Sequence, residues 1–482
     1  MRNYIFNFDP KTKPFPHQLE AVNYIQKNDS IALFDEQGLG KTKIILDSLC
    51  NNLKENKIDG ALIICKKNLI HNWQEEIETH SHLKSIVLRG TSKEKGIKFM
   101  GFSHFYLINY ESVFSEIGRL KMFLRIKKYA IVLDESHAIK NPESKTTKTI
   151  LELSDLAKKR IIVSGTPVAN KPEDLWSQFF FLDKGKLLGN SYSKFKALYT
   201  VDLRNTKNLI SSRSFDALKT IIESNSIRRR KNDVLELPEK IFIDKHINLT
   251  GKQLEMYKQL RDELFIAIQN LQGEIIIDES GGILKKLLRL AQIASNPKLI
   301  DHSYSEIPAK FPILYALVED IIMRNEKVIV WSCFVDNIRQ LNKEFQKYGA
   351  QMLYGDIPIE KRNIIIKRFK TDSNFKVLIA NPAAAKEGLT LTVANNAIYL
   401  DRNFNLVDYL QSQDRIHRIS QTKECKITKI LANDTIDEYI DEILRRKQYL
   451  AGYIQGDTNK IDISEKFTKE DILTYLGGTS HG

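Results

Sequence analysis

Short apolar runs separated by longer amphipathic segments characterise the first 170 residues of this chain. Each run is only a few residues long and rich in Ile, Val and Leu, which predicts buried strands rather than helices. Strands that alternate with helices favour a parallel sheet, and such sheets bind ligands at the carboxyl ends of their strands. The predicted strands are 31–34, 61–65, 105–108, 129–133 and 161–163, and the clearest helices between them are 14–25 and 43–53.

A second series of the same kind begins near residue 313. Its predicted helices are 313–324 and 337–347, and its predicted strands are 328–331, 377–380 and 398–400. We therefore expect an α/β fold with two lobes, each built on a parallel sheet.

The middle of the chain lacks this alternation and reads as mostly helical. Periodic apolar positions predict helices at 174–182, 215–223, 253–272 and 283–294, whereas the polar segment 301–312 contains two prolines and predicts a linker. One long amphipathic helix, 436–454, is predicted near the end. The expected organisation is a first lobe at 1–170, helical insertions with a return to that lobe at 171–300, the linker at 301–312, a second lobe at 313–440, and a closing helix and tail at 441–482.

Composition limits the class of protein. A chain of 482 residues with 42% hydrophobic content can build proper cores, so a disordered or fibrous protein is excluded. No apolar run approaches the roughly 18 residues of a membrane span, so we expect no membrane association and a cytoplasmic location, or a nuclear one in a eukaryote. The four cysteines form no CxxC pair, so neither a zinc site nor a disulfide framework is indicated.

The net charge of +13 suggests an anionic partner. Lys and Arg are scattered along the chain rather than gathered in one tail, which suits a nucleic-acid backbone bound by charge neutralisation. A Lys-rich composition from an AT-biased genome would give the same charge. Charge alone therefore favours nucleic acid only weakly.

The segment DEQGLGKT, residues 35–42, has the form of a phosphate-binding loop. It follows a predicted strand and precedes a predicted helix, which is the context such a loop requires. Gly38 and Gly40 allow the backbone to approach phosphates, Lys41 can reach the β and γ groups, and Thr42 can hold Mg²⁺. ATP and Mg²⁺ are the expected cofactors.

A second candidate site follows the strand at 129–133, where Asp134 and Glu135 begin the tetrapeptide DESH. Asp134 would hold the metal shell and Glu135 would orient or deprotonate the attacking water. The alternative is an acidic helix cap after a strand. The upstream phosphate loop makes the catalytic interpretation the better one.

Several segments together resemble the SWI/SNF-type ATPases, a branch of the superfamily-two helicase-like motors. The irregular start of the loop, Asp35-Glu36, is one of them. The others are the SGTP turn at 164–167, the segment RRRKNDV at 228–234, and QSQDRIHRISQ at 411–421, which matches the family pattern QxxDRxHRxGQ except for Ser420. The resemblance implies two RecA-like lobes with helical insertions.

Arg415 and Arg418 are three residues apart on a predicted helix and so share a face, where two guanidinium groups could reach one γ-phosphate. A basic helix with structural salt bridges is the alternative. The resemblance implies that the pair acts in cis as arginine fingers.

The resemblance also implies roles for other residues. Gln18 would recognise adenine, although a polar residue at a helix start is usually only a cap. Basic residues at strand ends and in a basic run are also more often solvated than functional. The implied coupling residues between ATP and nucleic acid are Ser164, Thr166, Gly388 and Gln411, and the implied DNA contacts are Lys66, Lys67, Asn109, Arg229 and Arg230.

Two departures from the family pattern indicate a subgroup. Alanines at 383–385 precede Gly388-Leu389-Thr390, and Phe404-Asn405-Leu406 stands where many members have Trp-Asn-Pro. Both look more like the distant branch that includes annealing helicases and compact bacterial or phage relatives. The expected function is an ATP-dependent translocase on double-stranded DNA that does not separate strands, acting as a monomer with unknown protein partners; the alternatives are a true DNA or RNA helicase and a catalytically inactive DNA-binding subunit.

Overall fold

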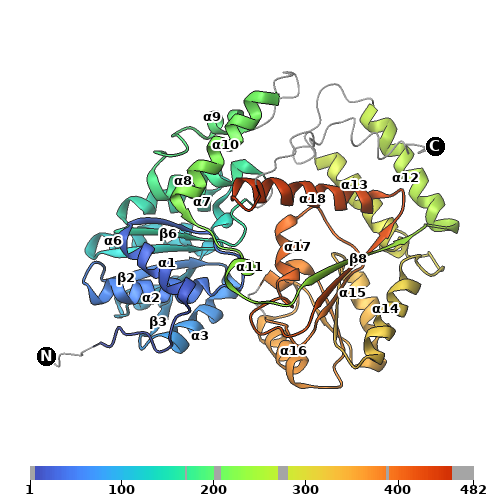
Figure 1. Cartoon of the computed structure of the whole chain (residues 1–482), viewed down its shortest axis with the longest axis horizontal. Helices are drawn as coiled ribbons and strands as arrows, with labels where there is room; N and C mark the ends of the chain where they lie inside the picture. The colour runs from blue at the N-terminus through green and yellow to red at the C-terminus, as the bar shows by residue number, and fades with distance from the viewer. Residues whose placement is uncertain (1–5, 169–170, 200–207, 270–280, 387–389, 459–482) are drawn as a thin grey trace. The chain divides into compact units, whose positions relative to one another are not determined.

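A seven-stranded parallel sheet forms the centre of the first unit of the computed structural model, which describes residues 6–168, 171–199, 208–269, 281–386 and 390–458 (Figure 1). Its strand order is β3-β4-β2-β5-β6-β1-β7. The strands are β1 (Ser30–Leu33), β2 (Gly60–Cys65), β3 (Ser85–Val87), β4 (Phe105–Asn109), β5 (Tyr129–Asp134), β6 (Lys159–Val163) and β7 (Ser226–Ile227).

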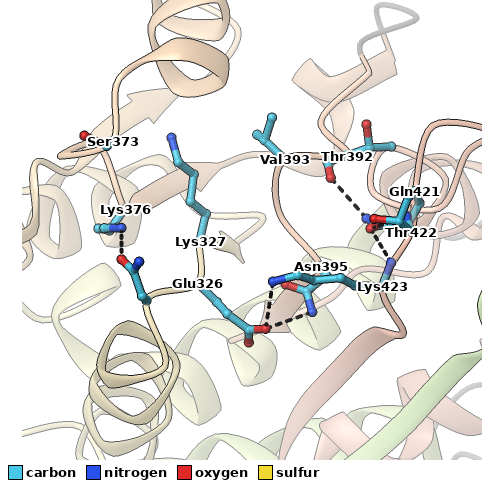
Figure 2. Close-up of a pocket in the computed structure, with 11 residues that line it drawn as sticks. Glu326, Lys327, Ser373, Lys376, Thr392, Val393, Asn395, Gln421, Thr422 and Lys423 are labelled. Carbon is cyan, nitrogen blue, oxygen red and sulfur yellow. Dashed lines mark hydrogen bonds and ion pairs between the residues drawn. The ribbon is translucent and has the colours of Figure 1, made fainter.

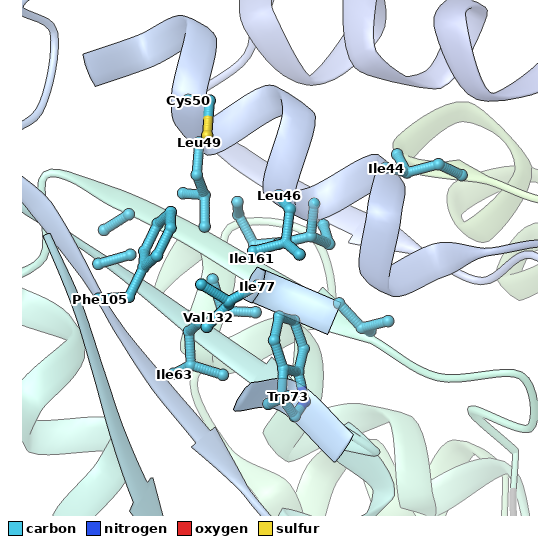
Figure 3. Close-up of a cluster of buried hydrophobic side chains, with 14 of the residues drawn as sticks. Ile44, Leu46, Leu49, Cys50, Ile63, Trp73, Ile77, Phe105, Val132 and Ile161 are labelled. Atoms are coloured by element: carbon cyan, nitrogen blue, oxygen red, sulfur yellow. The ribbon is translucent and has the colours of Figure 1, made fainter. Parts of the chain in front are cut away.

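Helices cover both faces of this sheet, since every residue of β2 is buried and successive strand residues point to opposite faces. Leu46 and Leu49 pack with Ile63, Val132 and Ile161 on one face (Figure 3). The helices of the unit are α1 (Pro16–Lys27), α2 (Lys41–Lys54), α3 (Ile70–His80), α4 (Ser92–Met100), α5 (Tyr110–Val113), α6 (Ile117–Ile126), α7 (Lys145–Leu153), α8 (Trp176–Asp183), α9 (Tyr192–Tyr199), α10 (Asn208–Asn225) and α11 (Lys231–Val234).

The second unit has its own parallel sheet of six strands, in the order β10-β11-β9-β12-β13-β8. Its strands are β8 (Lys240–Ile247), β9 (Val328–Trp331), β10 (Gln351–Leu353), β11 (Val377–Ala380), β12 (Asn396–Tyr399) and β13 (Cys425–Ala432). Its helices are α12 (Gly251–Gln269), α13 (Gly281–Ser295), α14 (Phe311–Met323), α15 (Val335–Glu344), α16 (Ile359–Thr371), α17 (Leu406–Gln413) and α18 (Ile436–Ile454). The α/β class with two parallel sheets is therefore confirmed.

The prediction of a mostly helical stretch at 171–300 missed β8, which pairs with β13 over eight residues, from Lys240 opposite Cys425 to Ile247 opposite Ala432. β8 lies at an edge of the sheet, and most of its side chains are exposed or half-buried. Charged residues interrupt its apolar positions, so it lacks the continuous apolar run that signals a buried strand.

The division between the units also differs from the expected one. It falls between Glu236 and Leu237, and the expected linker 301–312 lies inside the second unit. The reason is the pairing of β8 with β13, which commits the chain to the second sheet well before residue 301. The segment from Tyr449 groups with the first unit, where Tyr453 Oη donates to Asp216.

None of the helices in the described residues combines the length and the apolar character that crossing a membrane requires.

Candidate nucleotide-binding site

Three neighbouring strands of the first sheet bring the candidate chemistry to one edge. β6 lies between β5 and β1 in the sheet. DEQGLGKT follows β1, SGTP follows β6 and DESH begins at the end of β5. The strands are parallel, so all three segments lie at the carboxyl edge, where sheets of this class bind ligands.

The phosphate loop turns back onto α2, which begins at Lys41 and has Thr42 as its second residue. Gly38 and Gly40 have φ values of 91° and 77°, in the left-handed region that favours glycine. A Cβ at Gly40 would collide with Nε2 of Gln18. The loop therefore keeps the close backbone approach that a bound phosphate needs.

Gln18 is buried beside this loop, with an exposed fraction of 4%. Its Oε1 accepts a hydrogen bond from the Phe15 N–H at 3.0 Å, and its Nε2 donates to the Leu39 carbonyl at 3.2 Å. These bonds hold the start of α1 against the loop. The contact with adenine stays a prediction.

Lys41 is held within the loop itself. Its Nζ donates to the carbonyl oxygens of Asp35 at 2.9 Å and Glu36 at 3.2 Å. Desolvation lowers the pKa of Lys41, while the carboxylates of Glu135, Asp35 and Asp134 act in the opposite direction. An ammonium group that is poorly solvated gains from a phosphate anion, so this position fits a nucleotide.

The acidic pair is fixed by its neighbours at the end of β5. Asp134 Oδ2 accepts from Trp73 Nε1 at 2.8 Å, and Oδ1 accepts from the Glu135 N–H at 3.0 Å. Desolvation, with the neighbouring Glu135 carboxylate, raises the pKa of Asp134 to about 6. Glu135 has φ 52°, which is rare for a residue other than glycine and is often found at functional sites.

His137 connects this pair to two other segments. Its Nδ1 lies 3.3 Å from Oε2 of Glu135 and 3.4 Å from Oγ of Ser164, and its Nε2 lies 3.0 Å from Nζ of Lys66. A lysine only donates, so Nε2 accepts and Nδ1 carries the proton. Lys66, which we predicted to face DNA, is thus engaged at the candidate site.

Gln178 of α8 was not singled out in the sequence, yet it joins two of the site segments. Its Nε2 donates to the Pro167 carbonyl at 2.8 Å, and its Oε1 accepts from Ser136 Oγ at 2.6 Å. Ser136 belongs to DESH and Pro167 to SGTP. The sequence signal was weak, because Gln178 is one of three polar residues in an otherwise aromatic and apolar helix.

In the phosphate loop and the SGTP turn, three polar atoms are buried without a hydrogen-bond partner among the described residues. They are Oε1 and Nε2 of Gln37, in the loop, and Oγ1 of Thr166, in the SGTP turn. Buried polar atoms normally have partners, and a polar ligand bound here would supply partners for these three. Together with the acidic pair and Lys41, they fit a nucleotide with its metal ion.

Arg229, which we predicted to contact DNA, is engaged at the phosphate loop. Its Nε and Nη2 donate to the two carboxylate oxygens of Asp35 at 3.1 and 2.5 Å, and its Nη1 donates to the His17 carbonyl. Asp35 is fully buried, and removing a carboxylate from water is costly unless a cation pairs with it. The irregular first position of the loop is thus one half of a buried ion pair.

The other residues of the basic run are also engaged within the first unit. Arg228 pairs with Asp457 at 2.6 Å and donates to the carbonyl oxygens of Phe34 and Gly165. Arg230 is half exposed and pairs with Asp233 at 2.9 Å. Its contact with DNA stays a prediction.

Two other predicted DNA contacts lie at the ends of neighbouring strands. Lys67 is exposed and begins a short turn after β2, and Asn109 is the last residue of β4. Asn109 donates from Nδ2 to Glu111 Oε2 at 2.7 Å. Their contact with DNA is untested.

Arg415 and Arg418, in the second unit, do not share a helix face as predicted. α17 ends at Gln413, and both arginines lie in turns that follow it. The helix stops because the Arg415 N–H bonds to the Ser412 carbonyl, three residues back, and the Arg415 carbonyl accepts from the Leu391 N–H of a separate segment.

Within these turns Arg415 is 2% exposed, and Arg418 donates from Nε to the Asp414 carbonyl and from Nη1 to Thr390 Oγ1, both at 3.0 Å. Gln411 is buried on α17, and Gly388 lies outside the described residues.

A pocket of about 230 Å³ lies in the second unit, at the edge of the sheet where β9, β11, β12 and β13 begin (Figure 2). Lys376 donates to Asn325 Oδ1 at 2.6 Å, and Lys327 donates to the Asp372 carbonyl at 2.7 Å. Partners within the protein thus satisfy these cations, and nothing there indicates a ligand.

Comparison with known proteins agrees with the resemblance seen in the sequence. Residues 17–299 match the SNF2-related domain, and residues 309–420 match the helicase conserved C-terminal domain. An uncharacterized ATP-dependent helicase of Mycoplasma pneumoniae is 29% identical over 467 residues, covering 95% of this chain and 43% of that protein. A zebrafish (Danio rerio) chromodomain-helicase-DNA-binding protein 1-like is 27% identical over 449 residues, covering 88% of this chain and 42% of that protein.

The solved Sulfolobus solfataricus SWI2/SNF2 ATPase core in complex with dsDNA is 29% identical; its alignment covers 93% of this chain and 94% of that chain, with a TM-score of 0.44. The chain spans less than half the length of the two curated relatives above. With the SNF2-related match extending over more than half of its residues, the chain belongs to the SNF2-related family.

Proposed function

We propose that this chain hydrolyses ATP and uses the energy to translocate along double-stranded DNA without separating its strands. The observation that carries the proposal is the meeting of phosphate loop, acidic pair and SGTP turn on three adjacent strand ends of one sheet. Membership of the SNF2-related family and the ATP-dependent helicase name of the Mycoplasma relative support it.

In this proposal, the loop residues hold the nucleotide. Lys41 exchanges its bonds to loop carbonyls for bonds to phosphate oxygens, and Thr42 with Asp134 holds a Mg²⁺ ion. When bound, the ion neutralises charge on the phosphates. Glu135 orients and deprotonates the attacking water, and the neighbouring His137 limits how far its carboxylate can turn.

We also propose that Arg415 and Arg418 stabilise the charge that develops on the terminal phosphate. Arginine provides a fixed fork of donors suited to phosphate oxygens. Because the two arginines lie in turns and not on one helix face, each is assigned this role independently of the other.

The proposed DNA partner rests on the charge of +13 and on the DNA-binding name of the Danio rerio relative. Lys67, Asn109 and Arg230 are the proposed contacts among the described residues. Ser164, Thr166 and Gln411 are the proposed coupling residues, with Ser164 supported by its contact with His137.

The test measures ATP turnover with duplex DNA, single-stranded DNA and RNA, beside displacement of a third strand from a DNA triplex. We expect stimulation by duplex and displacement of the third strand, with no unwinding of a forked duplex. Stimulation by RNA alone contradicts the proposal, unwinding indicates a true helicase, and DNA binding without turnover indicates an inactive subunit.

A further inference from the structure

Gln37 is a polar residue of the phosphate loop that the roles above do not use. Its side chain is 7% exposed, and neither atom of its carboxamide has a hydrogen-bond partner among the described residues. A carboxamide offers two donor hydrogens and one acceptor oxygen, and burying all of these unpaired is unfavourable. The group is therefore suited to a ligand rather than to the packing of the loop.

The Gln37 side chain lies against Gly165 of the SGTP turn. A Cβ built at Gly165 would lie 2.6 Å from Cγ of Gln37 and 3.3 Å from Nζ of Lys41. The Gln37 side chain and the Lys41 ammonium thus meet at the same glycine of the SGTP turn. A larger residue at this position would displace one or both of them.

Thr166 is the next residue of the same turn, and its Oγ1 is also buried without a partner. The nearby Gly165 carbonyl already accepts from Arg228. The unpaired atoms therefore come from two segments, the loop and the turn, that enclose the Lys41 ammonium. A ligand that binds an ammonium and also accepts from an amide is an anion with several oxygens, such as a phosphate group.

We propose that Gln37 is a substrate-contacting residue whose Nε2 donates to the terminal phosphate of ATP, so that the loop distinguishes triphosphate from diphosphate. Because Gln37 already lies against Gly165, a bond from its amide to that phosphate would connect the SGTP turn to the terminal phosphate of the nucleotide. This inference rests on the proposed function, because it requires the loop to bind ATP.

The test compares Gln37→Met, which keeps the size but removes the amide, with Gln37→Glu, which replaces the amide by a carboxylate. Gln26→Met serves as the control, because Gln26 lies on α1 and also has a buried Oε1 without a partner. Dissociation constants for ADP and for a non-hydrolysable ATP analogue are measured on the full chain with Mg²⁺. Thermal unfolding is measured without nucleotide.

We expect Gln37→Met to weaken binding of the ATP analogue about tenfold and binding of ADP less than about twofold. Gln37→Glu should weaken the analogue further, because its carboxylate repels phosphate. Without nucleotide, Gln37→Met should unfold at the same temperature as the wild type or higher, since it removes unpaired polar atoms from the interior. Gln26→Met should leave both dissociation constants unchanged.

Unchanged binding of the analogue by both variants overturns the role of Gln37 while leaving the proposed function standing. Equal weakening of ADP and analogue also overturns it, since that result means a general disturbance of the loop. Failure of the wild-type chain to bind either nucleotide overturns the proposed function and this inference together.

Discussion

Two arginine-containing segments, 228–230 in the first unit and 414–418 in the second, use the arginine side chain in different ways. Arg229 binds the buried carboxylate of Asp35 through two nitrogens, whereas Arg418 donates to the carbonyl of Asp414 and the hydroxyl of Thr390. The first guanidinium completes an ion pair that the fold needs. Arg418 could exchange its bonds to the Asp414 carbonyl and the Thr390 hydroxyl for bonds to phosphate oxygens.

Basic residues of this chain are therefore not all available to contact nucleic acid or nucleotide. In the first unit, Arg229 binds Asp35 of the phosphate loop, and Arg228 donates to the carbonyl of Phe34, the residue before it. In the second, the arginines lie in turns whose geometry depends on a separate segment around Leu391. The following experiments separate structural from chemical roles, beginning with the largest expected effect.

Glu135→Gln should lower DNA-stimulated ATP turnover about ten-thousandfold, because the amide cannot accept a proton from water. Lys41→Ala should abolish turnover as well, by removing the phosphate contact. Both variants should bind duplex DNA nearly as the wild type does. Steady-state ATPase assays and fluorescence anisotropy measure the two properties.

Controls for these variants are Glu143→Gln and Lys54→Ala, whose exposed side chains pair with the exposed side chains of Lys148 and Asp9. Undiminished turnover in Glu135→Gln or Lys41→Ala would refute the assigned roles.

Arg418→Ala should lower turnover about a thousandfold if it acts on the developing charge of the terminal phosphate. The midpoint of urea unfolding should change little, since the side chain of Arg418 is only partly buried. Arg339→Ala, at an exposed site on α15, is the matched control. A large loss of stability with normal turnover per folded molecule would make Arg418 a structural residue.

Arg229→Ala should lower the free energy of unfolding by about 3–5 kcal/mol, because it leaves Asp35 buried without its cation. Arg230→Ala, one residue on and half exposed, should cost less than about 1 kcal/mol. Urea unfolding measures both. Adding Asp35→Asn to Arg229→Ala should recover part of the loss, and no recovery would show that the ion pair is not the cause.

Asp134 should make stability depend on pH in a definite direction. Folding raises its pKa from 3.8 to about 6, so the folded chain binds the proton more readily than the unfolded chain. Its contribution is full below pH 3.8 and is lost as the pH rises through 6. Without Mg²⁺ or nucleotide, Asp134→Asn should therefore be more stable than the wild type at pH 8, by about 1–3 kcal/mol.

The measurement for Asp134→Asn is urea unfolding at pH 5 and pH 8. The gain should be smaller at pH 5, where the wild-type carboxyl is mostly protonated. An equal gain at both pH values would assign the effect to packing rather than to charge.

Lys67→Ala should have the smallest effect. If Lys67 neutralises one phosphate, the slope of log affinity for duplex DNA against log salt should become shallower by about 0.9. Lys54→Ala, on the far end of α2 from the loop, should leave the slope unchanged. An unchanged slope in Lys67→Ala would remove this residue from the proposed DNA surface.

The sequence alone determined the parts of this protein that depend on consecutive residues. β1, the phosphate loop and α2 were predictable because strand, glycine turn and helix follow one another along 25 residues, Ser30 to Lys54. The same holds for β5 with Asp134 and Glu135, and for α18, whose predicted range 436–454 is the observed one. Local patterning carries this information because burial and backbone geometry act within a few residues.

Only the tertiary structure decided which distant residues complete the site. Arg229 lies 194 residues from Asp35, and Gln178 lies 42 residues from Ser136, yet each pair is in direct contact. β8 is a strand because β13 offers it hydrogen bonds, although charged residues interrupt its apolar positions. Arg415 and Arg418 leave the helix because a neighbouring segment takes a backbone bond. Such pairings depend on how the chain returns on itself, which no local pattern contains.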